Sequence, residues 1–410
     1  MCMRPNASNR PNAALLGAFW FGIQMVLGAL LGISLQARSI QLAPHQALAA
    51  FGLLMASGAC VAAVTQIAAG ILSDRRRLRG SRRLEFYAAG AVAGALAVVY
   101  FYTAPVFWQL VASFMLLQLA LNMAMGPYQA AIPDFIELKN LGSASAWMAA
   151  LQSAGNVAGV VVAAFVKSAA AAGAVIGTVL LLACAATGLH VRKLSPVEEV
   201  AAPLRITRAF IDLFISRALV YAGFYTLVGY LYFYVARTMS GDVKTHTGLL
   251  ILLFLAAAAI GALVAGRPAN RFDRRDVATA GGGVFILALV LFLFAAISGQ
   301  VVGAATLAGF AWGVFLTADW ALGCTFLPRG ALATAMGIWN LALLIPQIAA
   351  PAIVTTVLSV LRALQSTEAP RIAFVIAAIE VAAGVIWLRR LPASRSSGAW
   401  RGTSGNNGRT

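Results

Sequence analysis

The sequence predicts an all-α membrane protein with twelve transmembrane helices in two related, pseudo-symmetric six-helix bundles. Hydrophobic residues make up 61% of the 410 residues and charged residues only 10%, whereas soluble domains average about 45–50% and about 25%. The apolar residues form about twelve segments, each near the roughly 20 residues that a helix needs to cross a bilayer. A basic motif also occurs twice, about half a chain apart, and such repetition indicates two homologous halves.

The first half is expected to cover residues 14–190, after a polar cytoplasmic tail at residues 1–13. The first apolar run is too long for the core of a secretory signal peptide, so an uncleaved first helix is expected. The helices of this half are predicted at residues 14–36, 48–72, 87–104, 106–132, 143–168 and 169–190.

A change of composition at residues 191–208 marks the predicted cytoplasmic linker between the halves, because charged residues and prolines replace the apolar run there. The second half is expected to cover residues 209–390. Its helices are predicted at residues 209–238, 246–266, 277–298, 300–326, 331–361 and 370–390. The tail at residues 391–410 is rich in Ser, Gly and Arg, and we expect it to be disordered and cytoplasmic.

The net charge of +17 follows the predicted topology. With the N-terminus inside, most Lys and Arg residues fall in cytoplasmic loops and tails, where basic residues next to membrane helices are retained. We therefore expect a multi-pass protein of the plasma membrane, in bacteria the inner membrane, with both termini cytoplasmic and the basic loops against anionic lipids of the bilayer. Because topology accounts for the charge, no nucleic-acid partner is expected.

The reactive side chains do not form the constellation of an enzyme or a metal site. The four cysteines are scattered and the three histidines lie far apart at helix ends, so neither a disulfide framework nor a metal centre is supported. No Gly-Lys-Ser/Thr phosphate-binding loop is present. We therefore expect no enzyme, no cofactor and no metal, and a monomer whose energy source is a gradient.

The organising motif is a basic cluster between two apolar segments. It begins Gly70-Ile-Leu-Ser-Asp74-Arg75 and continues with further arginines, and a weaker copy contains Asn270-Arg271. The motif resembles the loop between helices 2 and 3 of the major facilitator superfamily, a family of secondary transporters. The resemblance implies a conformational lock of Gly70, Asp74, Arg75, Asn270 and Arg271 that forms and breaks as the halves rock. A plain positive-inside loop is the alternative.

The resemblance also implies what Asp74 contacts. In the family fold the inner end of helix 2 meets the N-terminus of helix 11, which lies near Ala331 here. Unpaired N–H groups and the helix dipole at such a terminus stabilise a carboxylate by about 0.3–1 kcal/mol. The following arginines are expected to bridge to acids such as Asp134 or Glu137. Asn270 takes the place of the Asp in the second copy, so that lock is expected to be weaker.

Three charges, Asp319, Arg217 and Glu380, fall well inside predicted helices, where insertion costs about 2.5–3.5 kcal/mol and marks functional candidates. Asp319 lies roughly 13 Å above the inner end of its helix, and Arg217 lies at a comparable height. Their helices both line the central cavity of the family fold, so the two side chains can meet there. We hypothesise that Asp319 is the proton-coupling carboxylate and Arg217 its partner or a solute donor, with a structural ion pair as the alternative. Glu380 lies in a peripheral helix, where a packing or cavity-edge role is expected.

Polar side chains recur at helical spacing on the helices expected to line the cavity. Neutral hydrogen-bonding groups between aromatic rings suit a polyhydroxylated or mixed polar and apolar solute, and hydrogen bonding between helices is the alternative. The stripe on the seventh helix extends to Tyr232. The expected solute-binding residues are Trp20, Gln24, Asn122, Gln129, Tyr221, Tyr225, Trp312 and Asn340.

Further motifs narrow the resemblance. They are Phe19-Trp-Phe-Gly22, Ser73-Asp74-Arg75, Gly126-Pro127-Tyr128-Gln129, Asp319-Trp320-Ala321-Leu322 and Met336-Gly337-Ile338-Trp339-Asn340. Over nearly the whole membrane region the chain is similar to bacterial relatives of the sucrose and glycoside–cation symporters. This resemblance implies movement of sugars or glycosides together with protons.

These features predict a secondary active transporter that moves a small organic solute, sugar-like or glycoside-like, by alternating access, with a proton or another cation as the coupling ion. One alternative is a proton-coupled exporter of drugs or metabolites, although the scarcity of acids in the first six helices counts against a pump for cationic drugs. An alternative of another class is a non-transporting membrane receptor or scaffold, but we find no added soluble domain to relay a signal.

Overall fold

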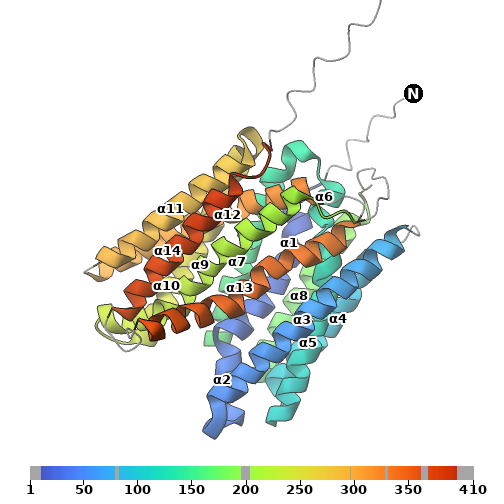
Figure 1. Cartoon of the computed structure of the whole chain (residues 1–410). Helices are drawn as coiled ribbons and strands as arrows, with labels where there is room; N and C mark the ends of the chain where they lie inside the picture. The colour runs from blue at the N-terminus through green and yellow to red at the C-terminus, as the bar shows by residue number, and fades with distance from the viewer. Residues whose placement is uncertain are drawn as a thin grey trace, which may run out of the picture.

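Helices form all the regular structure in the part of the chain that the computed structural model describes. This part comprises residues 11–78, 83–194, 204–295, 297–327, 331–361 and 368–394. The long helices run alongside one another as a bundle (Figure 1). Most of the predicted tails and of the linker lies outside the described residues.

The first half contains six spans. The first span is divided into α1 (Ala13–Ala29), the π-helical turn η2 (Leu30–Ser34) and α2 (Leu35–Leu42). The other five are α3 (Ala47–Leu78), α4 (Leu84–Thr103), α5 (Phe107–Tyr128), α7 (Leu141–Phe165) and α8 (Ala169–Val191). The short elements between them are η3 (Pro44–Gln46), α6 (Ala131–Phe135) and η4 (Leu138–Asn140).

The second half contains six further long helices. They are α9 (Arg208–Thr238), α10 (Val243–Arg271), α11 (Arg274–Phe294), α12 (Ser298–Phe326), α13 (Leu332–Val360) and α14 (Ala369–Leu388). Among the described residues, eleven spans of the chain are long and apolar enough to cross a membrane, and α13 adds a shorter apolar stretch, Leu332–Gln347. The predicted all-α membrane fold is therefore confirmed.

The predicted helix ends differ from the observed ones where helices project beyond the apolar core. The first span continues to Leu42 rather than ending at residue 36, and α3 continues to Leu78 rather than ending at residue 72. The fall in hydropathy predicts where the bilayer ends, whereas the helix continues into polar surroundings until its hydrogen bonding is interrupted.

The helix packing of the first half repeats in the second. α1 packs against α7 and α8 as α9 packs against α13 and α14. α5 packs against α3 and α4 as α12 packs against α10 and α11, and the α4–α8 pair corresponds to α11–α14. The contacts between the halves are also paired, because α7 packs against α10 and α13 packs against α3. This pseudo-two-fold arrangement confirms the two related six-helix bundles.

The first helix begins and the last helix ends at the same end of the bundle, which we call the arginine-rich end. The Asn12 N–H before α1 donates to His190 Nε2 at the end of α8 (2.9 Å). Arg389, just after α14, pairs with Asp276 at the start of α11 (2.7 Å). The α3–α4 and α10–α11 connections also lie at this end (Figure 1). The chain therefore crosses the bundle an even number of times.

Candidate functional site

A buried ion pair joins α9 and α12 in the interior of the second half. Arg217 Nη1 donates to Asp319 Oδ2, and the two side chains are only 1% and 2% exposed. Arg217 Nη2 also donates to the Tyr221 hydroxyl, one turn further along α9, at 3.2 Å. The structure thus brings together the two charges that the sequence places at similar heights in different helices.

Aromatic rings enclose the Arg217 guanidinium. Its Cζ lies 3.7 Å from the centre of the Trp339 ring, 4.7 Å from that of Tyr221 and 5.7 Å from that of Trp320. A cation over an aromatic face is stabilised by about 0.5–2 kcal/mol, and most when both are desolvated. Arg217 is therefore held in place by ring contacts as well as by Asp319.

The predicted aromatic residues extend this cluster across both halves. The ring of Trp20, in α1, lies 5.8 Å from that of Trp320, in α12. Within the second half, the Tyr221 ring lies 4.9 Å from that of Trp312 and 6.2 Å from that of Tyr225. The structure therefore gathers the four predicted aromatic solute-binding residues into one aromatic region around the ion pair.

Two of the predicted amides bond to protein groups in this conformation. The side chain of Gln24, in α1, lies 3.5 Å from that of Gln152 and 3.1 Å from that of Asn156, both in α7. Asn122 Nδ2 donates to the backbone carbonyl of Gln118 at 2.8 Å. Hydrogen bonding within the first half therefore engages both amides.

The other two predicted amides lie at the boundary between the halves or lack partners. Asn340 Nδ2, in α13, donates to Gln66 Oε1, in α3, at 2.8 Å, and so links the two halves. Gln129, at the end of α5, is 2% exposed. Neither its side-chain nitrogen nor its oxygen has a hydrogen-bond partner within the described residues. A buried amide without partners is costly, so the Gln129 side chain has unused hydrogen-bonding groups in this conformation.

The first basic motif closes the arginine-rich end between α3 and α13. Asp74 Oδ1 accepts from the Ala333 N–H at 3.2 Å, and Oδ2 accepts from the N–H and hydroxyl of Thr334 at 2.8 and 2.7 Å. Because α13 begins at Leu332, these N–H groups have no partner within the helix. A Cβ at Gly70, one turn earlier, would lie 2.7 Å from Ala333 O. The close approach therefore requires glycine.

Arg83 pairs with Asp74, whereas Arg75 does not. Arg83 lies 2.9 Å from Asp74 Oδ1 through Nη1 and 2.9 Å from Asp134 Oδ2 through Nε. It is buried, but Arg75 is exposed. α3 continues through Arg75, whose side chain is exposed, whereas Arg83 precedes α4 and lies beside both carboxylates. The expected bridge to Asp134 is therefore made by Arg83, which follows the α3–α4 connection, and not by Arg75.

The second motif makes the corresponding closure between α10 and α7. Asn270 Oδ1 accepts from the Gly142 N–H at 2.7 Å, and its Nδ2 donates to Ser143 Oγ at 2.7 Å. Asn270 therefore caps α7 as the first motif caps α13, but without a negative charge. Arg271 is exposed, whereas Arg274 is buried and donates to a backbone carbonyl of the first half at 2.5 Å.

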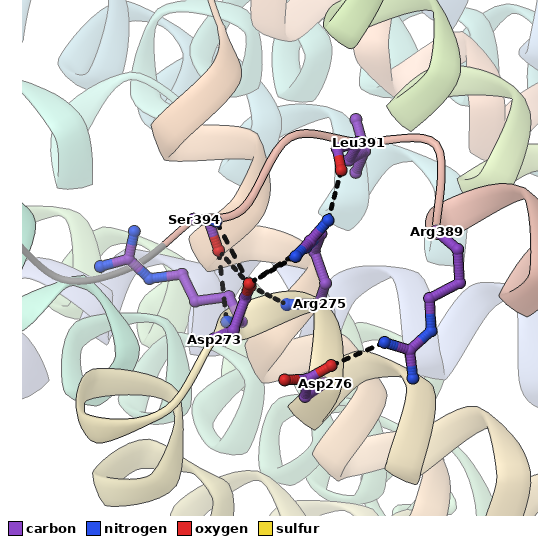
Figure 2. Close-up of polar contacts among 7 residues, drawn as sticks. Asp273, Arg275, Asp276, Arg389, Leu391 and Ser394 are labelled. Atoms are coloured by element: carbon purple, nitrogen blue, oxygen red, sulfur yellow. Dashed lines mark hydrogen bonds and ion pairs between the residues drawn. The ribbon is translucent and has the colours of Figure 1, made fainter.

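The segment after α14 folds over the start of α11 (Figure 2). Asp273 caps α11 by accepting from the Arg275 N–H at 3.0 Å, and it also accepts from the Ser394 hydroxyl at 2.9 Å. Arg275 donates in turn to the Leu391 carbonyl. This network ties the end of the second half to the α10–α11 connection, which carries the second closure.

The Asp273 network predicts a pH-dependent contribution to stability. Burial alone would raise the pKa of Asp273, but hydrogen bonds from Arg275 and Ser394 lower it from 3.8 to about 2. A lowered pKa stabilises the fold at pH values above 3.8, and this contribution is lost as the pH falls toward 2. Because this carboxylate is partly screened by solvent, we expect Asp273→Asn to lose about 1 kcal/mol at neutral pH.

Thermal unfolding in detergent, measured from pH 7 to pH 3, tests this expectation. The difference in Tm between the parent and Asp273→Asn should be largest near pH 7 and should narrow below pH 4. Asp276→Asn is the matched control, because Asp276 forms an exposed pair with Arg389 and such pairs contribute little. A Tm difference that does not change with pH would contradict the assignment.

Several contacts at the site involve residues that the sequence did not single out for a role. They are Gln66, Arg274, Trp320 and Trp339. A lone amide in an apolar run is a signal that could have identified Gln66, whereas the ring contacts of Trp339 depend on packing between distant helices. Tyr232, expected on the cavity stripe, is 48% exposed and does not join the buried aromatic cluster. Glu380 accepts from Thr226 Oγ1 at 3.0 Å, which agrees with a packing role.

Two related six-helix bundles of membrane-length helices, with a buried charge pair inside the second, define a multi-pass membrane protein. The sequence profile of the Major Facilitator Superfamily matches residues 13–351. The chain belongs to this family, whose members are transporters rather than enzymes.

Solved structures of other transporters show the same fold at low identity. The Escherichia coli fucose:proton symporter FucP has a TM-score of 0.73 and 14% identity, with 93% of this chain and 98% of that chain covered. The human organic anion transporter MFSD10 has a TM-score of 0.70 and 13% identity, with 92% and 100% covered. A bacterial homologue of the iron transporter ferroportin, in an outward-facing state, has a TM-score of 0.65 and 14% identity, with 92% and 98% covered. No curated protein matches the chain in sequence.

Proposed function

We propose that the protein is a secondary active transporter that moves a small organic solute by alternating access, coupled to protons through Asp319. The buried Arg217–Asp319 pair is the observation that carries this proposal. Each charge costs about 2.5–3.5 kcal/mol at the centre of a membrane helix. A carboxylate that is desolvated beside an arginine can take up and release a proton as its surroundings change.

Alternating access is supported by the two closures at the arginine-rich end. Asp74 joins α3 to α13, and Asn270 joins α10 to α7. Each consists of a few hydrogen bonds at a helix N-terminus, so the halves can separate there without breaking helices. We assign this end to the cytoplasmic side of a bacterial inner membrane, with both termini cytoplasmic, because basic loops are retained on that side.

The aromatic region around the ion pair supports a solute with both polar and apolar surfaces. Aromatic faces with a few fixed polar groups are typical of solute sites. A sugar-like or glycoside-like solute agrees with the resemblance to the sucrose and glycoside–cation symporters, and FucP is named as a fucose:proton symporter.

Flux in proteoliposomes tests the proposal. Purified protein is reconstituted, and uptake and efflux of sugars, glycosides, organic acids and amphiphilic drugs are measured with and without an imposed pH gradient. We expect at least one solute to accumulate only when the gradient is present. Flux that is equal with and without the pH gradient would indicate a uniporter. The absence of flux for every solute would favour a receptor or scaffold.

A further inference from the structure

Buried hydrogen-bond donors without partners occur at the ion pair and on the helices packed beside it. Within the described residues, no partner is found for Arg217 Nε, Trp339 Nε1, Gln66 Nε2 or the side-chain amide of Gln129. All four side chains are at least nine-tenths buried. Only Gln129 adds an unpaired acceptor to this set. The region therefore offers more donors than acceptors.

A series of contacts connects these four side chains, and we call the set the donor block. The Arg217 guanidinium lies 3.7 Å from the centre of the Trp339 ring. The next residue, Asn340, bonds to Gln66 at 2.8 Å. Gln66 packs against α5 at Gly126, where a Cβ would lie 2.6 Å from Gln66 O. Gly126 lies one turn before Gln129. The donors thus come from α3, α5, α9 and α13, and so from both halves.

The excess of donors discriminates between kinds of solute. A buried donor without a partner costs about 1–3 kcal/mol, so a group that accepts from several donors gains most. A neutral sugar hydroxyl donates as well as accepts, and Gln129 is the one member of this set that offers an unpaired acceptor. A carboxylate only accepts, and a guanidinium binds it through two parallel hydrogen bonds.

We propose that the transported solute carries a carboxylate, which replaces Asp319 as the partner of Arg217 when Asp319 is protonated. This inference rests on the proton-coupled transport proposed above. The rings of Trp339, Tyr221 and Trp320 hold the guanidinium in place while its anionic partner changes. The proton neutralises Asp319 and the solute neutralises Arg217.

The replacement of Asp319 by the solute carboxylate determines the net charge that crosses the membrane in each transport cycle. One proton and one monoanionic carboxylate cross together, so each cycle moves no net charge. A neutral solute moved with one proton would carry one positive charge per cycle. Transport of a carboxylate should therefore respond to a pH gradient and ignore the membrane potential.

The test uses reconstituted protein and two matched pairs of solutes that differ in a carboxylate. The pairs are glucuronate with glucose, and 4-carboxyphenyl glucoside with phenyl glucoside. A pH gradient and a potassium–valinomycin potential are imposed separately. We expect pH-driven uptake of a carboxylate to exceed that of its neutral partner by about 10-fold or more, the value of one charge-assisted hydrogen bond, and to be unchanged by the potential.

Two variants examine the donors. Trp339→Phe keeps the ring over Arg217 but removes the indole N–H, and it should raise the apparent KM for the carboxylate by about 5-fold, the effect of one lost hydrogen bond. Trp108→Phe, at a position that is 71% exposed, should leave transport unchanged. Equal KM effects of the two variants would count against the donor role of Trp339.

Failure of the inference and failure of the proposed function give different results. Preferred, potential-stimulated uptake of the neutral members under a pH gradient would overturn the carboxylate inference and leave proton coupling standing. Carboxylate uptake that responds to the potential would overturn the charge balance. The absence of pH-driven uptake of both carboxylates, beside pH-driven uptake of another solute in the wider screen, would overturn the inference alone, whereas the absence of flux for every solute in that screen would remove the proposed function.

Discussion

Replacing Asp319 by Asn abolishes pH-driven accumulation of the solute, while exchange of solute without a gradient continues. Asn keeps the size of the side chain and can still accept from Arg217, but it does not bind and release a proton. A gradient of about two pH units supports about 100-fold accumulation of a solute that moves with one proton. We expect the variant to reach about equal concentrations on the two sides, measured in proteoliposomes with and without preloaded solute.

Asp319→Asn leaves the buried positive charge of Arg217 without its anionic partner, so the effect of this unpaired charge is measured with a second variant. Breaking a buried ion pair by removing one partner costs about 3–5 kcal/mol, although the rings that enclose Arg217 reduce this loss. The double variant Arg217→Gln with Asp319→Asn removes both charges and should recover stability without recovering accumulation. Asp276→Asn, in an exposed pair, should accumulate solute normally. Uphill accumulation by a folded Asp319→Asn variant would contradict the coupling role.

The sequence predicts the fold and the placing of charges along helices because both depend on local pattern. Span number follows from apolar length, and height in the bilayer follows from counting residues along a helix. Arg217 and Asp319 lie at comparable heights on this count, and the structure pairs them. Local pattern places Asp74 at the end of its helix, whereas its contact with the N-terminus of α13 is implied only by the resemblance to the major facilitator superfamily.

Contacts set by loop geometry or by packing between distant helices are not predictable in this way. Arg83 rather than Arg75 meets the carboxylates, because the returning chain determines which arginine faces inward. Trp339 touches Arg217 only because α13 crosses α9 with that face inward. Tyr232 keeps the helical spacing of its stripe, but it is not covered by neighbouring helices at its height and is exposed. Helical spacing predicts which side chains share one face of a helix, but it does not predict which neighbouring helices cover that face.

Replacing Gly70 by Leu keeps the arginine-rich end open and reduces transport by at least about 10-fold. A Cβ at this position would lie 2.7 Å from Ala333 O and 3.0 Å from Thr334 N. Both are backbone atoms at the start of α13, so they cannot move aside as a side chain could, and α3 and α13 must separate. Leu is favoured over Gly inside a helix by about 1 kcal/mol, so the loss would not come from weakening α3.

Labelling distinguishes an open end from a misfolded protein. Thr334→Cys, in a background without the native cysteines, is shielded by Asp74 in the closed conformation. A water-soluble maleimide should label it about 10-fold faster in Gly70→Leu than in the parent, because the closed state excludes the reagent in proportion to its population. Gly52→Leu is the matched control, because it lies in the same helix and a Cβ there meets nothing within 4 Å. If Gly70→Leu transports normally, or if Gly52→Leu fails equally, closure of α3 on α13 is not required for transport.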